Sequence, residues 1–175
     1  MNQAVNQAVI PAIPPERIQF GHLSGRAAQA NDTAFLEALY LASRPDLGAL
    51  PVPREVVAGI ARHQRQLQTA DYARRYPRLE DWVIEEGGLP VARLALARGE
   101  GTALLRVVDL SVAPQARRRG VARTLLRSLR EAGQAQPQAI ALRVRADNAP
   151  ARALYDGLGF TLLRDDGATL ELAWI

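Results

Sequence analysis

One stretch of fourteen residues gathers groups that bind anions. Between Asp109 and Ala122 the sequence is typical of a strand end, a turn and a helix start. Three consecutive arginines, Arg117 to Arg119, precede Gly120, and a guanidinium can pair with phosphate oxygens through two hydrogen bonds. The first N–H groups of a helix lack partners within the helix and carry partial positive charge, and glycine lets a bulky anion approach them. The stretch is therefore predicted to bind a phosphate or pyrophosphate group.

A second stretch, from Asn148 to Phe160, carries two further polar groups of chemical interest. Asn148 can cap a helix whose first turn holds Pro150 and which ends at Gly159. Leu154 and Leu158 mark an apolar face of this helix, beside which Tyr155 can pack in the core.

The composition excludes several other kinds of chemistry. All 22 basic residues are arginine, there is no cysteine and there are two histidines. A phosphate-binding loop ending in Lys-Ser or Lys-Thr is therefore absent, and no Gly-x-Gly-x-x-Gly follows an early strand. Thiolate catalysis, cysteine-based zinc sites and disulfides are excluded, and we expect no bound metal. The arginine bias is typical of a GC-rich, bacterial-like composition.

The charge is concentrated in the second half of the chain. Residues 89–175 carry 13 arginines against 8 acids, whereas residues 1–88 carry 9 against 10. An anionic ligand is therefore expected to bind the second half. The start of the chain lacks a secretory signal pattern, and no apolar run approaches the roughly 20 residues that span a bilayer. We expect a cytoplasmic protein that has no membrane partner.

The hydrophobic periodicity predicts one mixed α/β domain over residues 17–175, behind a flexible leader over residues 1–16. The expected element order is β-α-α-β-β-β-α-β-α-β-β. The elements are a strand over 17–23, helices over 33–45 and 54–76, a hairpin of 82–84 and 91–97 around Gly87-Gly88, a strand over 104–112, a helix over 119–132, a strand over 140–144, a helix over 150–159 and a hairpin of 160–163 and 169–174.

Together the two stretches resemble the GNAT superfamily of N-acetyltransferases. The pattern Arg117-x-x-Gly120-x-Ala122 after a strand looks like the cofactor motif of that family, and residues 148–160 look like its Asn…Leu-Tyr-x-x-Leu-Gly-Phe signature. The resemblance covers about residues 17–175. It implies an α/β (α+β) fold with a mixed, mostly antiparallel sheet flanked by helices. The sheet would be splayed between its fourth and fifth strands, leaving a slot for a pantetheine arm.

The resemblance also implies a reaction and a set of site residues. Acetyl-CoA is the implied cosubstrate, and a primary amine of a small molecule or peptide attacks it directly, without a covalent enzyme intermediate. The main chain around Leu110 and Val112 would polarise the thioester carbonyl, and Tyr155 would donate a proton to the CoA thiolate. The implied cofactor-binding residues are Leu110, Ser111, Val112, Arg117, Arg118, Arg119, Gly120, Val121, Ala122, Arg123, Asn148 and Tyr155.

The group that removes a proton from the amine is left open by the sequence. Some relatives have a glutamate eleven residues before the arginine of the cofactor motif, and this chain has Arg106 there. Asp109, Glu85, Glu86 and a chain of waters are the candidates. Strand alternation places Asp109 on the face opposite Val108, Leu110 and Val112, and pairing with a neighbouring arginine is its competing role.

The sequence also allows two functions other than acetyl transfer, and it offers one strand for a dimer contact. A CoA-binding sensor without turnover would explain the missing glutamate at position 106. A nucleic-acid-binding module would use the six arginines between positions 117 and 130. Leucines alternate with those arginines and no aromatic residue interrupts them, so we expect no nucleic-acid partner. The apolar final strand, Leu170 to Trp174, could pair with the sheet edge of a second copy and form a homodimer.

Overall fold

The computed structural model describes residues 16–98, 104–132 and 138–175. The leader predicted over residues 1–16 lies outside these residues, except for Glu16. Within the described residues, eight strands form one sheet in the order β1-β2-β3-β4-β5-β6-β8-β7. The elements are β1 (Arg17–Phe20), β2 (Leu23–Ala27), α1 (Thr33–Ala42), α2 (Pro45–Gly48), α3 (Arg54–Arg75), β3 (Glu80–Glu86), β4 (Leu89–Arg98), β5 (Leu104–Val112), α4 (Val121–Glu131), β6 (Ala139–Arg145), α5 (Ala149–Asp156), β7 (Thr161–Asp165) and β8 (Thr169–Trp174).

The first strand differs from the prediction. Residues 17–23 were expected to form one strand, but the chain reverses at Gly21 and His22, so that β1 and β2 form an antiparallel hairpin. Gly21 has a φ of +62°, which glycine adopts without the steric cost that a Cβ imposes. The hairpin adds one strand to the predicted order, so the fourth and fifth predicted strands are β5 and β6.

The sheet is antiparallel except between β5 and β6. These two strands pair in parallel over four residues, from Leu104 opposite Ala139 to Val107 opposite Leu142. Beyond Val107, β5 continues beside β4 alone, while β6 continues beside β8. The predicted mostly antiparallel sheet, splayed between these two strands, is therefore confirmed.

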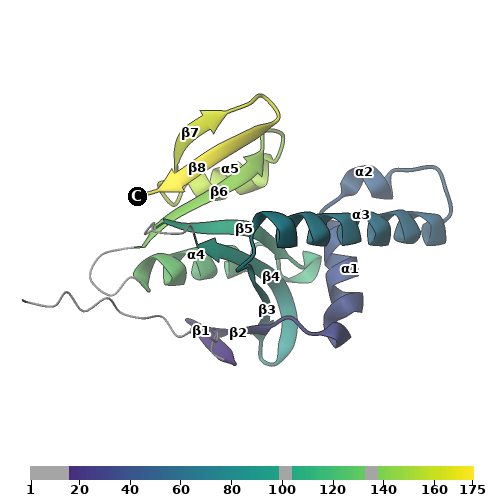
Figure 1. Cartoon of the computed structure of the whole chain (residues 1–175), viewed down its shortest axis with the longest axis horizontal. Helices are drawn as coiled ribbons and strands as arrows, with labels where there is room; N and C mark the ends of the chain where they lie inside the picture. The colour runs from purple at the N-terminus through teal and green to yellow at the C-terminus, as the bar shows by residue number, and fades with distance from the viewer. Residues whose placement is uncertain (1–15, 99–103, 133–137) are drawn as a thin grey trace, which may run out of the picture.

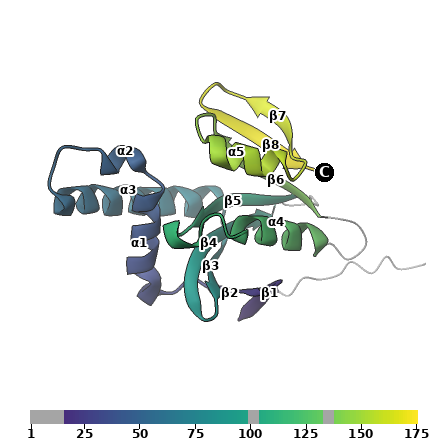
Figure 2. The ribbon, with the colours of Figure 1, turned by 180° about the vertical axis from the view of Figure 1, so that it is seen from behind.

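Helices cover both faces of the sheet. Helix α4 carries an apolar stripe that includes Leu125 and Leu126, both fully buried in the main core together with Ile84 and Ile140. Figures 1 and 2, which view the molecule from opposite sides, show α4 and α5 on one face and α3 on the other. None of the described helices is long and apolar enough to cross a bilayer.

A bulge in β5 decides which side chains face which helices. Ala95 of β4 pairs with Asp109, but the next β4 residue pairs with Val107, so Val108 has no partner in this ladder. The extra residue leaves Leu110 and Val112 packed against the same core as Val107. Asp109 and Ser111 therefore face the opposite side of the sheet, where α3 lies, as strand alternation predicted for Asp109.

The last strand is not at the edge of the sheet. Strand β8 pairs with β6 on one side and with β7 on the other, so the edge on this side of the molecule is β7. The prediction that residues 170–174 could pair with a second copy is therefore wrong, because their backbone groups already pair within the chain. Strand β7 itself is short, bulged at Leu163 and charged at Arg164 and Asp165, features that oppose pairing between sheet edges.

Candidate functional site

A cleft of about 1280 Å³ opens where β5 and β6 separate. All predicted cofactor-binding residues except Arg119 line the cleft. They are Leu110, Ser111 and Val112 on β5, Arg117, Arg118, Gly120, Val121, Ala122 and Arg123 at the start of α4, and Asn148 and Tyr155 at the β6–α5 side. The fold thus brings together two stretches of sequence that were selected separately.

The turn before α4 presents a row of free backbone donors to this cleft. Arg118 and Gly120 both have positive φ, +60° and +84°, and Gly120 is the N-cap of the helix. Among the described residues, the N–H groups from Arg118 to Arg123 have no hydrogen-bond acceptor. Successive N–H groups at a helix N-terminus, together with the helix dipole, form a site suited to an anion with several oxygens, such as a pyrophosphate.

The arginine side chains in and after this turn differ in their hydrogen-bond partners. The Arg117 guanidinium donates to the carbonyl oxygens of Val112 at 3.0 Å and of Ala42 at 3.1 Å, so it ties the end of β5 to the end of α1. Arg119 donates to Glu86 at 2.6 Å and lies outside the cleft lining. Arg123 lines the cleft, and no hydrogen bond of its side chain is found among the described residues.

Asn148 and Tyr155 hold the opposite wall. The Asn148 side chain accepts a hydrogen bond from the Ala151 N–H at 3.3 Å, which is the helix-capping role that the sequence allowed. Tyr155 is 8% exposed, and its ring packs against Phe160 with centroids 5.4 Å apart. Burial, with a smaller effect of the Asp109 charge, raises the pKa of the Tyr155 phenol to about 12, so the hydroxyl is protonated at neutral pH.

Asp109 lies one hydrogen bond away from the cleft. It accepts from the Ser111 hydroxyl at 2.8 Å and from the Arg93 guanidinium at 2.9 Å. Arg93, itself buried, also donates twice to Asp81, each time at 2.8 Å. Burial raises the pKa of the Asp109 carboxyl, against the opposing effect of Arg93. The arginine partner considered for Asp109 is therefore present, and the Ser111 hydroxyl connects the carboxylate to the cleft. The role of Asp109 as proton acceptor stays a prediction.

The other acids named as proton acceptors are held in ion pairs. Glu85 is buried and accepts from Arg17 and Arg26, both at 2.8 Å. Glu86 accepts from Arg119 and lies 3.3 Å from the His22 ring nitrogen. Neither glutamate lines the cleft.

Arg106, which stands where some relatives have glutamate, is also paired. Its guanidinium donates to Glu171 at 2.7 Å. Arg106 therefore joins β5 to β8 and does not line the cleft.

Two parts of the cleft wall were not predicted. Ala42, Ser43, Pro45 and Asp46 line it from the α1–α2 segment, and Arg145 and Asp147 line it from the end of β6. Each wall carries its own local ion pair, Arg44 with Asp46 at 2.6 Å and Arg145 with Asp147 at 2.5 Å. The pair at 145 and 147 adjoins the second motif and could have been noticed, whereas nothing local in the α1–α2 segment indicated a ligand.

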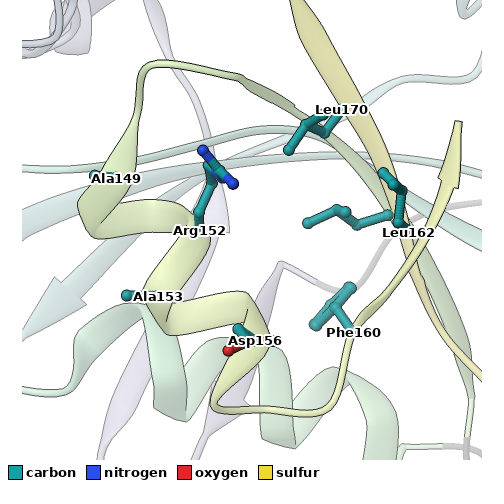
Figure 3. A pocket seen from close by; sticks show the side chains of 8 residues that line it. Ala149, Arg152, Ala153, Asp156, Phe160, Leu162 and Leu170 are labelled. Carbon is teal, nitrogen blue, oxygen red and sulfur yellow. The ribbon is translucent and has the colours of Figure 1, made fainter. Parts of the chain in front are cut away.

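A second, smaller pocket of about 470 Å³ lies on another side of α5, facing β7 and β8. Figure 3 shows Phe160, Leu162 and Leu170 around it, with Arg152 and Asp156 extending from the helix. None of the predicted site residues lines this pocket. Among the described residues, no group of three or more metal-ligating side chains is found.

Comparison with known proteins identifies the class to which this site belongs. The model of the acetyltransferase (GNAT) family matches residues 49–160, which include the turn before α4 and the residues from Asn148 to Phe160. The chain belongs to the GNAT acetyltransferase family, and its class is therefore that of the acyltransferases. No curated protein matches the chain.

Solved structures share the fold at low sequence identity. The PaiA N-acetyltransferase of Thermoplasma acidophilum, in complex with coenzyme A, is 14% identical with a TM-score of 0.62, covering 86% of this chain and 97% of that chain. An acetyltransferase of Thermus thermophilus is 22% identical with a TM-score of 0.63, covering 90% and 99%. RimJ of Mycobacterium smegmatis, in complex with CoA-disulfide, is 22% identical with a TM-score of 0.59, covering 89% and 82%.

Proposed function

We propose that this chain transfers the acetyl group of acetyl-CoA to a primary amine of a small molecule or peptide. The observation that carries the proposal is the cleft between the diverging ends of β5 and β6, with unpaired N–H groups at one end and Tyr155 in its wall. The pantetheine arm of acetyl-CoA has a pyrophosphate at one end and the thioester at the other, and the cleft offers groups suited to each. The coenzyme A in the complexes of PaiA and RimJ supports this assignment.

The free edge of β5 is suited to the pantetheine arm. Beyond Val107 no described residue pairs with the β6 side of this strand, so an extended ligand can pair with backbone groups around Leu110 and Val112. In the same place, backbone N–H groups can stabilise the oxyanion that forms when an amine attacks the thioester carbonyl. The turn from Arg118 to Arg123 would then hold the pyrophosphate.

Three side chains would move protons. An amine of lysine type is mostly protonated near pH 7 and must lose a proton before it attacks. We assign this proton to the Asp109 carboxylate, reached through the Ser111 hydroxyl. Attack of the neutral amine forms the N–C bond and the oxyanion, and collapse of this adduct breaks the C–S bond. The departing thiolate takes a proton from Tyr155, and the nitrogen gives its second proton to solvent. The phenolate regains a proton from solvent, and Asp109 releases its proton to solvent.

The second candidate is a CoA-binding sensor without turnover. Arg106, which stands where some relatives have glutamate and is paired with Glu171, is the observation in its favour. The nucleic-acid alternative loses support, because the arginines between 117 and 130 do not form one free basic surface. Arg119 is paired with Glu86, and Arg130 donates to the Trp174 carbonyl and stacks on the Trp174 ring, 4.6 Å from its centroid.

Thermal unfolding with a ligand series tests the binding half of the proposal. Ligands that bind the native state raise the melting temperature by mass action. We expect acetyl-CoA, CoA and desulfo-CoA to stabilise the protein well beyond ADP, since ADP lacks the pantetheine arm. Stabilisation by a DNA duplex that disappears at high salt, with none by CoA, would instead support nucleic-acid binding. Release of free thiol from acetyl-CoA in the presence of amines then separates an enzyme from a sensor.

A further inference from the structure

The inward face of α3 changes from apolar to polar along its length. Val57 and Ala61 are buried against α1 and α2. The following positions on the same helix face, at the spacing of three to four residues that one face requires, are Arg65, Gln68 and Tyr72. Figure 1 shows α3 crossing the sheet so that its C-terminal half lies at β4 and β5. This polar part of the helix therefore faces the side of the sheet that carries Asp109.

The acids on this side of the molecule already have cationic partners. Arg93 takes both Asp81 and Asp109, as described above. Glu37 of α1 is paired with Arg62 at 3.2 Å. Asp81, Asp109 and Glu37 are therefore each paired with an arginine. An incoming ammonium group finds no unpaired carboxylate among these three acids.

Arg65 is the cation that is left over. Its side chain is partly buried and has no ion pair or hydrogen bond among the described residues. Burial and the neighbouring Arg93 charge lower the pKa of the Arg65 guanidinium, although it stays charged. One turn further along α3, the Gln68 side-chain oxygen is buried and finds no hydrogen-bond partner in the described parts of the chain. A buried polar atom without a partner costs free energy that a bound ligand can recover.

These two unsatisfied groups are complementary to one kind of ligand. Resting on the proposed function, we propose that the acceptor amine carries a carboxylate, which Arg65 binds, while Gln68 accepts an N–H of the same molecule. The amine then extends toward Ser111 and Asp109, at the cleft. The class comprises free amino acids and peptides with an acidic side chain near the amino terminus, which present the same two groups.

A matched panel of acceptors tests the proposal and separates the two sources. The acceptors are free L-amino acids against their carboxamides, and dipeptides with Asp or Glu in second position against those with Asn or Gln. We expect kcat/KM to be at least about tenfold higher for the carboxylate member of the pairs in one of the two sets, as charge-assisted hydrogen bonds to arginine imply. Preference in the first set identifies amino acids, and preference in the second identifies acidic peptides.

The Arg65→Gln variant ties this preference to one side chain. We expect it to abolish the preference by raising KM for the carboxylate acceptors, so that each carboxylate acceptor and its neutral partner give similar kcat/KM, with KM for acetyl-CoA unchanged. Arg54→Gln removes the same charge from an exposed position at the start of α3 and should keep the preference. Neutral amines acetylated as well as their carboxylate partners would overturn the inference while the proposed function stands. If CoA binds and no amine is acetylated, both fall.

Discussion

The Ser111 hydroxyl donates a 2.8 Å hydrogen bond to the Asp109 carboxylate, two positions back on β5. Ser111 lines the cleft, and Asp109 reaches Arg93 and thereby the region beneath α3. The bulge at Val108 sets the side of the sheet on which both residues lie. This bond therefore connects the part of the cleft assigned to the thioester with the part of the molecule assigned to the acceptor.

Replacing Tyr155 by phenylalanine tests its role as general acid. The ring would keep its packing against Phe160, so we expect little change in stability or in CoA affinity. We expect kcat to fall on the order of a hundredfold, the usual contribution of a positioned acid. Steady-state kinetics and a thermal melt measure the two quantities, and a Tyr155→Phe enzyme with unchanged kcat would remove the assignment.

Asp109→Asn tests the proton acceptor through pH dependence. Burial raises the pKa of Asp109, so in the wild-type protein the carboxylate is protonated, and kcat/KM falls, at a higher pH than for an exposed aspartate. A raised pKa also means that the folded state takes up this proton more readily than the unfolded state. At acidic pH, where Asp109 is protonated, the group therefore does not destabilise the fold. We expect the variant to lose about a hundredfold in kcat/KM at neutral pH and to lose this acidic limb. An unchanged pH profile would assign the limb to another group.

Gly120→Ala tests the anion site at α4. Gly120 has a φ of +84°, which costs a residue with a Cβ about 1–2 kcal/mol. Since the new Cβ would also shift the backbone that presents the N–H groups, we expect the Kd for CoA to rise about tenfold. Gly167→Ala provides a matched control, because Gly167 has a φ of +87° and likewise no atom near the added Cβ, but lies in the β7–β8 turn. Equal losses of CoA affinity in the two variants would contradict the site.

Asp32 is predicted to contribute to stability against acid. It is buried, accepts two hydrogen bonds from Arg26 at 2.7 Å and one from the Gln29 N–H, and the Arg26 guanidinium lowers its pKa. A lowered pKa means that this stabilisation is complete above the ordinary value of 3.8 and is lost as pH falls below it. We expect Asp32→Asn to reduce the free energy of unfolding at pH 7 by about 2–4 kcal/mol, measured by urea denaturation.

The effect of Asp32→Asn should shrink as the wild-type protein is taken to acid. Asp46→Asn, which removes an exposed partner of Arg44, is the control and should change stability little. A difference between wild type and Asp32→Asn that stays constant from pH 7 to strongly acidic pH would contradict the role of the carboxylate charge.

Local patterns in the sequence were enough for most of the fold and for the cleft. The splayed sheet, α4 and the N–H row followed from Gly120, from the apolar stripe of α4 and from the resemblance. The Gly21 reversal was missed because the alternation of Ile18 and Phe20 was extended to Leu23, although His22 and Leu23 do not continue it. The α1–α2 wall was missed because the contact of Arg117 with Ala42 joins residues 75 positions apart.

Ion-pair partners were equally beyond the sequence. Arg119 was expected among the cofactor-binding residues, but its partner Glu86 lies 33 positions away and holds the guanidinium outside the cleft lining. For the same reason, the sequence did not show which charged side chains beside α3 pair with one another. Only the fold brings Arg93 between Asp81 and Asp109 and leaves Arg65 without a partner among the described residues.

Mass spectrometry of an amine panel after incubation with deuterium-labelled acetyl-CoA tests the central claim most directly. The account predicts that at least one primary amine gains the labelled acetyl group, in proportion to the free CoA released. It also predicts that Tyr155→Phe slows the formation of the acetylated amine and of free CoA by the same factor. Binding of acetyl-CoA with no labelled amine from the panel would contradict the acetyltransferase account and leave the chain as a CoA-binding sensor.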